Sequence, residues 1–269
     1  MRGLHYEWRH VAALRSTWVL LSVIATLNLA AGLATPFGLK PGSAPSSWSM
    51  ATTLQMDAVA LQLPLSALLL LPLETGSIAT ELTRGSARTT WLTLACRRTA
   101  YMSKLLVGGA IGALTALGGA ILAALSAGVC LAATGHLQPA WTHTLPSLLG
   151  YVLFMTCWPL IALSTTVLVR NRTAAVLLLV LWPLLGERIT GLALRLVPGL
   201  APVADWLPFS AGRAAMAASA DTLSEADRAM TQTLIGSDLS SAAGAAAFLA
   251  FTVLCAILGT QAYTKRDVY

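Results

Sequence analysis

The chain has 269 residues, of which 56% are hydrophobic and only 10% are charged, and its mean hydropathy is +0.72. A soluble domain normally carries about 25% charged residues, because its surface must face water. This composition excludes an ordinary soluble protein and predicts an all-α, polytopic membrane protein, in which lipid surrounds apolar helices.

The net charge of +6 and the pI near 9.5 would also fit a nucleic-acid-binding protein. The basic residues lie at the ends of apolar stretches, however, which is typical of membrane orientation and of contact with lipid headgroups. We therefore expect membrane lipids and no nucleic acid among the partners. The four cysteines are scattered without a CxxC pair, so neither a metal site nor a disulfide is predicted.

The N-terminal residues 4–14 have the pattern of an amphipathic helix. Leu4, Trp8 and Val11 recur at helical spacing, whereas Glu7 and His10 lie elsewhere on the helical wheel. We predict that this helix lies along the membrane interface before the chain enters the first span. The alternative is a disordered tail, since so short a helix is marginal by itself.

Six apolar stretches meet or approach the roughly 20 residues that a helix needs to cross a bilayer core. They predict a single transmembrane domain over residues 1–269. The predicted spans cover residues 17–39, 53–75, 105–134, 145–169, 174–197 and 241–263. The end of the first stretch, residues 31–34, also resembles a signal-peptide cleavage site, but its loss would leave five spans.

Small residues in the third predicted span favour close helix packing. Gly108-x-x-x-Gly112 lets another helix approach its backbone. Packing within this chain is the interpretation that we favour, and contact with a second copy is the alternative.

The distribution of Lys and Arg predicts the orientation of the chain. With six spans both termini lie on one side, and 12 of the 17 basic residues fall on that side. They are Arg2, Arg9, Arg15, Arg84, Arg88, Arg97, Arg98, Lys104, Arg170, Arg172, Lys265 and Arg266. Because positive loops stay in the cytoplasm, we predict that both termini and the loop at 76–104 are cytoplasmic.

The loop after the second predicted span is too polar to enter lipid and favours a short helix. Its motif reads Glu81-x-x-x-Gly85-x-x-Arg88, with Arg84 inside it and a basic cluster after it. We interpret this segment as a docking surface for a soluble partner. The alternative is a solvated loop with ordinary cytoplasmic positive charge.

This motif resembles the loop of bacterial ABC type-2 transporter permeases. That family has Glu-Tyr-x-x-Gly-Thr-x-Arg, followed by a basic cluster and a Lys before the third span. Leu82 and Ser86 stand here in place of the Tyr and the Thr. The amphipathic N-terminal segment, the six spans and the terminal Lys265-Arg266-Asp267 also agree with the family.

The resemblance implies a permease of the bacterial cytoplasmic membrane that has no ATPase activity of its own. Two such permeases, identical or related, pair side by side, and each presents a coupling helix to a cytosolic ABC ATPase subunit. ATP and Mg bind to that partner, and this chain needs no cofactor. Glu81, Arg84, Gly85 and Arg88 would belong to the coupling helix. The family mostly exports its substrates.

The fifth predicted span contains Glu187 and Arg188, in its outer half. A charge at the bilayer centre costs about 2.5–3.5 kcal/mol even on permissive scales, so these residues must pair, face inward or reach the interface. One interpretation places them on the translocation path, together with Asp57 and Gln62 of the second span. The other is an ion pair that extends to the interface at a broken helix. After this span, we expect residues 205–235 to form an outer loop with a short helix, capped by Asp221 or Ser224.

Motifs for chemistry within this chain are missing. The sequence has no GxxxxGK[ST], GxSxG or HExxH, so we predict no enzymatic activity. Few charges lie inside the spans, which favours an amphipathic or lipophilic substrate such as an antimicrobial peptide, a drug or a lipid. Antibiotic resistance would follow from such export. A non-catalytic immunity or assembly protein is the alternative, followed by an intramembrane lipid-modifying enzyme.

Overall fold

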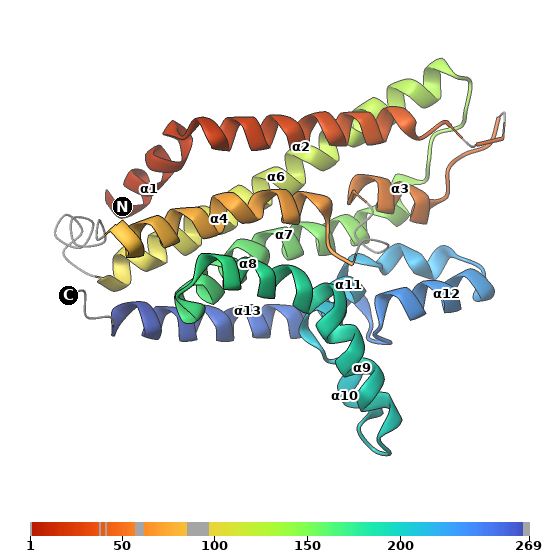
Figure 1. The fold of residues 1–269 in the computed structure, drawn as a ribbon. Helices are drawn as coiled ribbons and strands as arrows, with labels where there is room; N and C mark the ends of the chain where they lie inside the picture. Colours follow the sequence, from red (N-terminus) through yellow and green to blue (C-terminus); the bar gives the residue numbers. More distant parts are fainter. Residues whose placement is uncertain (1, 38, 41, 57–61, 85–96, 266–269) are drawn as a thin grey trace.

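The computed structural model describes residues 2–37, 39–40, 42–56, 62–84 and 97–265, and every regular element in these ranges is helical (Figure 1). The helices before the midpoint are α1 (Arg2–Ala13), α2 (Arg15–Ala34), α3 (Ser47–Leu54), α4 (Leu65–Arg84) and α6 (Arg97–Ala133). They are followed by α7 (Trp141–Val169), α8 (Arg172–Leu181), the π-helix η1 (Trp182–Gly186), α9 (Glu187–Leu196), α10 (Ala201–Asp205), α11 (Pro208–Met216), the 3₁₀-helix η2 (Ala218–Thr222), α12 (Glu225–Ile235) and α13 (Ser241–Thr264).

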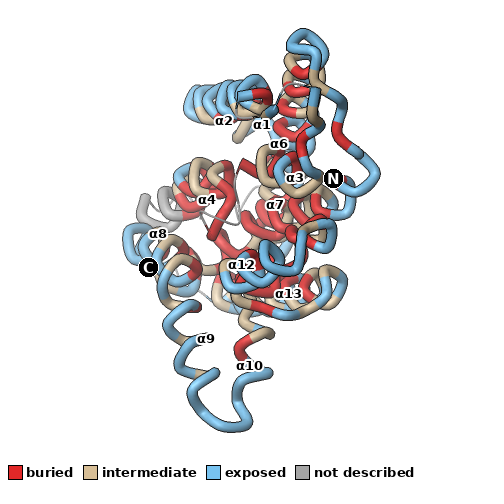
Figure 2. The backbone as a smooth tube through the Cα atoms, turned by 90° about the vertical axis from the view of Figure 1, so that its right-hand side faces the viewer, coloured by how far each residue is buried: buried red, intermediate tan, exposed pale blue. Residues whose placement is uncertain are grey.

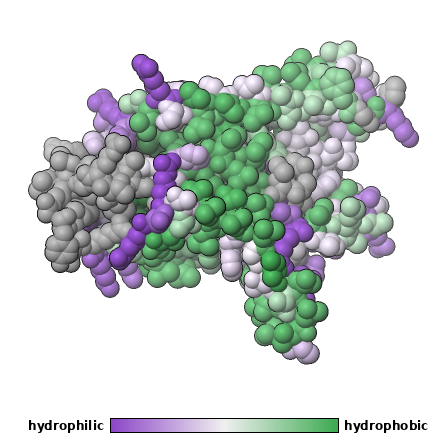
Figure 3. Space-filling model, in the orientation of Figure 1, coloured by the Kyte–Doolittle hydropathy of each residue, from purple (hydrophilic) through white to green (hydrophobic). Residues whose placement is uncertain are grey.

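Five helices are long and apolar enough to cross a membrane: α2, α6, α7, the unit from Arg172 to Leu196, and α13. Five of the six predicted spans are thus confirmed as long apolar helices. Large apolar side chains stay exposed on these helices, and they form a hydrophobic surface across the middle of the molecule (Figure 3). The chain therefore has the character of a multi-pass membrane protein.

The second predicted span, residues 53–75, differs from the prediction. It is divided between the end of α3 and the start of α4, and both Met56 and Gln62 have positive φ angles. Pro64 follows shortly after, and a proline disfavours helical backbone in the residue before it. The apolar part of α4, Leu65–Gly76, is only about 18 Å long and is too short to cross by itself.

Helix α7 is the centre of the bundle. In its apolar window 61% of the residues are buried, against 22% or 33% in the other four candidate spans. Buried residues gather around α7 and α4, whereas α2 and α9 are largely exposed (Figure 2). Trp158 of α7 donates from Nε1 to the carbonyl of Ala67 in α4 at 2.9 Å, so a hydrogen bond accompanies the apolar contact.

Helices α6 and α7 approach closely at Gly112. A Cβ atom on Gly112 would lie 1.9 Å from the carbonyl oxygen of Met155, so only glycine fits there. The small residues of the third predicted span therefore serve packing within this chain at this position, which confirms the interpretation that we favoured.

The fifth predicted span stays continuous through Glu187. One π-helical turn, Trp182–Gly186, joins α8 to α9, where one of the two interpretations placed a broken helix. Pro183 lies in this turn, and because proline lacks an N–H, the ordinary helical bonding is interrupted there. Helices α9 and α10 then form a hairpin that projects from the bundle (Figure 1).

The region at 205–235 differs from the predicted outer loop. It folds into helices, and α11 packs between α7 and α13. Phe209 of α11 is buried against Trp158 and Phe248. The predicted short helix does form as α12, and Ser224 is its N-cap, accepting from the backbone N–H of Asp227 at 3.3 Å.

Both termini lie at one end of the bundle, which we call the terminal end (Figure 1). The C-terminal end of α4 and the start of α6 reach the same end. The N-terminal segment is helical as α1, and its Leu4 and Trp8 side chains are exposed. An apolar exposed face is what an interfacial helix needs, although its contact with lipid stays a prediction.

Candidate functional site

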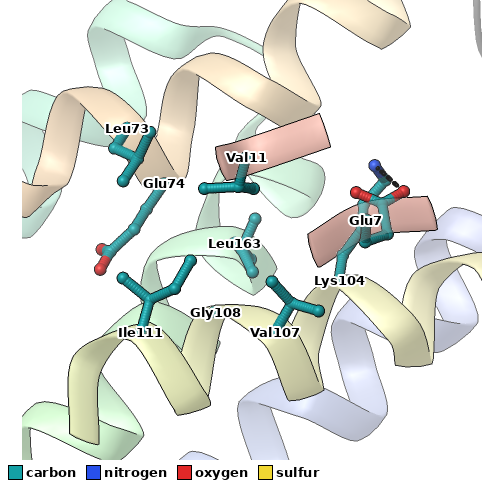
Figure 4. Close-up of a pocket in the computed structure, with 9 residues that line it drawn as sticks. All are labelled: Glu7, Val11, Leu73, Glu74, Lys104, Val107, Gly108, Ile111 and Leu163. Carbon is teal, nitrogen blue, oxygen red and sulfur yellow. Dashed lines mark hydrogen bonds and ion pairs between the residues drawn. The ribbon is translucent and has the colours of Figure 1, made fainter. Parts of the chain in front are cut away.

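A buried ion pair at the terminal end joins α1 to α6. Lys104 Nζ lies 2.7 Å from Glu7 Oε1, and both side chains are 3% exposed. Burial of two charges costs several kcal/mol per ion, and removal of one partner would leave the other uncompensated. The pair therefore fixes the position of α1 against α6 (Figure 4).

A small cavity lies beside this pair, where α1, α4, α6 and α7 meet (Figure 4). Leu73 and Glu74 line it from α4 and Ile111 lines it from α6. Its volume of about 30 Å³ has room for about one water molecule. Glu74 is also buried, so α1, α4 and α6 each contribute a buried charged residue to the lining, beside apolar ones.

The predicted coupling residues lie at the terminal end or outside the described residues. Glu81 and Arg84 are in the last turn of α4. Gly85 and Arg88 fall between α4 and α6, in the range that the structure does not describe. The motif therefore begins on a helix that packs against α2, α6, α7 and α8.

Two other basic residues connect helices at this end. Arg97 Nη1 donates to the carbonyl of Thr264 at 3.3 Å, which joins the start of α6 to the end of α13. Arg172 Nη2 donates to the carbonyl of Pro72 at 3.2 Å, which joins α8 to α4. Some of the basic residues that predicted the orientation therefore also form hydrogen bonds between helices.

A second cluster lies toward the other end of the bundle and is built around Glu187. Its carboxylate accepts from the backbone N–H groups of Phe209 and Ser210, both at 2.8 Å. These are the second and third residues of α11, whose N-cap residue, Leu207, offers no side-chain acceptor. Glu187 therefore caps α11 from another helix, and its negative charge faces the positive end of the helix dipole.

Arg213 belongs to the same cluster. Its Nη2 lies 3.8 Å from Glu187 Oε2 and donates to Ser210 Oγ at 2.7 Å, while Nε donates to the carbonyl of Ile235 at 2.9 Å. Burial lowers the pKa of Arg213 to about 10, and Glu187 opposes that shift. The guanidinium thus remains charged at neutral pH and links α9, α11 and α12.

Three of the four candidate path residues can be placed. Arg188 Nε donates to Gln62 Oε1 at 3.0 Å, and its Nη2 donates to the carbonyl of Leu234 at 2.8 Å. Glu187 is the next residue along the helix, so Gln62, Arg188 and Glu187 are brought together. Asp57 lies outside the described residues.

Neither Glu7 with Lys104 nor Arg213 was predicted as a site residue. Glu7 and Lys104 are 97 residues apart, and no local pattern reports such a pairing. The sequence contains a weak indication that Arg213 is buried. It lies in a segment that begins with Pro208 and is rich in glycine and alanine, which is typical of a closely packed helix.

No group of three or more His, Cys, Asp and Glu side chains in the described part of the chain could hold a metal ion. In comparisons with known proteins, the chain matches no protein-family model and no curated protein.

Proposed function

We propose that the chain is the membrane-spanning permease subunit of an ATP-driven ABC exporter in the bacterial cytoplasmic membrane, with both termini cytoplasmic. One observation carries the proposal. The motif Glu81-x-x-x-Gly85-x-x-Arg88 begins in the last turn of α4, at the end of the bundle that also holds both termini. A permease needs its docking segment and its cytoplasmic ends on one side of the membrane.

The buried Glu7–Lys104 pair supports coupling through this end. A partner that pushes on the segment after α4 acts on a helix that packs against α6 and lines a small cavity with the Glu7–Lys104 pair, which holds α1 and α6 together. Movement of α4 would then be passed to α1 and α6 as one unit. The energy for this movement comes from a cytosolic ABC ATPase subunit, which binds the ATP and Mg, and the permease works with a second copy or a related chain.

An apolar cleft supports an amphipathic or lipophilic substrate. It has a volume of about 390 Å³ and lies between α7, α8, α11 and α13. Phe209 and Phe251 line it, and Leu178 and Trp182 stand at its exposed side. Such a surface accepts an apolar chain or ring without leaving buried polar groups unpaired. An antimicrobial peptide, a drug or a lipid fits this chemistry.

Charge reversal in the coupling segment tests the proposal. We expect Glu81→Arg and Arg84→Glu each to lower the Mg-ATP hydrolysis that co-purifies with the solubilised permease at least about tenfold, because like charges would face each other across the docking surface. Arg228→Glu is the matched control, since Arg228 is exposed on α12, toward the opposite end of the bundle. Labelling with 8-azido-ATP would identify the nucleotide-binding subunit.

The contrary result is equally clear. If the wild-type chain recruits no polypeptide that 8-azido-ATP labels, and both reversals keep their function in cells, the permease proposal is wrong. A membrane immunity or assembly protein would then explain the fold better.

A further inference from the structure

A cavity of about 510 Å³ opens between α9, α11 and α12, next to the Glu187 cluster. Three arginines line it. Arg188 and Arg195 are exposed, whereas Arg213 is 1% exposed. The cavity is thus positively lined from its open side down to a buried guanidinium.

Arg213 is incompletely satisfied by the protein. Its Nε and Nη2 have acceptors in Ile235, Ser210 and Glu187. Its Nη1 is buried and has no hydrogen-bond acceptor among the residues that the structure describes. A buried donor without an acceptor is costly, so a ligand oxygen that reached this nitrogen by a small side-chain movement would be bound favourably.

The other charges around the cavity leave room for an anion. Both oxygens of Glu187 already accept backbone N–H groups of α11. Asp205 pairs with Arg195 at 2.6 Å, and Asp238 lies exposed at the cavity edge. Arg188 is bonded only to neutral oxygens among the described residues, so its positive charge is not cancelled by a carboxylate there.

The surface next to the cavity is apolar. Ile189, Leu192 and Leu196 of α9 recur at spacings of three and four residues, so they share one helix face, and all three are exposed. The face continues onto the projecting α9–α10 hairpin through Leu200 and Val203, which are also exposed. Positive charge thus lies beside a strip that fits an acyl chain.

We propose that this cavity binds the phosphate headgroup of an anionic membrane lipid, with Arg188 and Arg213 holding the phosphate and α9 contacting the acyl chain. Charge-assisted bonds from guanidinium to phosphate oxygen are short and strong, and Arg presents a fork that matches them. The hairpin would then lie in the lipid layer next to the bundle. Binding does not require transport, so a negative result here leaves the permease proposal standing.

Lipid titration of the purified full chain in neutral detergent tests this proposal. We expect phosphatidylglycerol to raise the thermal unfolding midpoint at concentrations at which phosphatidylcholine does not. Arg188→Gln should weaken the apparent affinity for phosphatidylglycerol about tenfold, and Arg188→Lys, which keeps the charge but not the fork, should weaken it by less. Arg228→Gln is the control, because Arg228 is an exposed arginine of α12 that does not line this cavity.

Each midpoint is compared with that of the same variant without lipid, so a loss of stability is not mistaken for a loss of binding. Equal shifts with both lipids, or equal affinities of Arg188→Gln and Arg228→Gln, would overturn the site. Inorganic phosphate is the second probe. If it stabilises the chain as strongly as the lipid does at equal concentration, the acyl-chain contact is wrong.

Discussion

Glu187 is a buried charged residue that has a structural role in a largely apolar bundle. A carboxylate in a predicted span is expensive, yet here it accepts two backbone N–H groups of α11 and lies near Arg213. Those N–H groups would otherwise be unsatisfied at the start of a buried helix, because Leu207 cannot cap it. The role of Glu187 on a translocation path stays a prediction, and the geometry of the cap favours a structural role.

Replacing Glu187 should therefore unfold the α11 region. We expect Glu187→Ala to lower the free energy of unfolding by about 3–5 kcal/mol, since it leaves a buried arginine without its partner. The measurement is thermal or denaturant unfolding in detergent. Glu225→Ala is the matched control, as Glu225 is an exposed acid in the first turn of α12 and should cost only about 0.3–1 kcal/mol. Equal losses for both variants would refute the buried cap.

Among the elements, α6 and α7 show what sets the helix spacing. They are the third and fourth predicted spans, and their contact depends on glycine because the carbonyl of Met155 occupies the space of a Cβ at Gly112. Gly118 lies on the same helix, less than two turns further on, and has open space around its Cβ position. Close packing therefore requires a glycine at position 112 but not at position 118, because the two residues lie on different faces of α6.

The two glycines make a matched pair of substitutions. We expect Gly112→Ala to destabilise the protein by about 1–3 kcal/mol, because the methyl group would overlap a backbone oxygen. Gly118→Ala should be neutral or stabilising by up to about 1 kcal/mol, since alanine favours helix and meets no atom there. Unfolding midpoints in one detergent compare them directly, and a larger loss for Gly118→Ala would contradict the packing.

For the whole molecule, the decisive feature is that both termini, the C-terminal end of α4 and the start of α6 lie at one end. Five helices qualify as spans by length and composition, and an odd number would separate the termini. Helix α4 runs along the bundle although its apolar part is short. Six crossings therefore stay a prediction, in which α3 and α4 together would supply the sixth.

Cysteine labelling tests this topology. In a variant without the four native cysteines, we expect a membrane-impermeant maleimide to label Glu225→Cys in intact cells, and Thr90→Cys only after the cells are opened. Glu225 is exposed on α12 and Thr90 follows the coupling motif, so both should be accessible to solvent on their own side. Labelling of Thr90→Cys from outside would reverse the orientation and remove the basis for an ATPase partner.

Helix class and most helix bounds followed from apolar run length, because a bilayer imposes one length scale on every crossing. The second predicted span does not follow this rule, because the positive φ angles of Met56 and Gln62 interrupt the helix within the run at 53–75. Residues 205–235 escaped it too, since α11 is short and looks like a loop until α7 and α13 bury it. Run length says nothing about a helix that is buried by other helices.

The sequence by itself determined that this is a membrane protein, that it is helical and which loops carry the positive charge. Each of these depends on composition or on neighbours along the chain. Only the tertiary structure decided which charges meet. Glu7 pairs with Lys104, which is 97 residues away in the sequence, and Glu187 caps the start of α11, which is 22 residues away. Such pairings depend on how the helices pack, and packing within lipid rests on close contacts of small residues that no local pattern specifies.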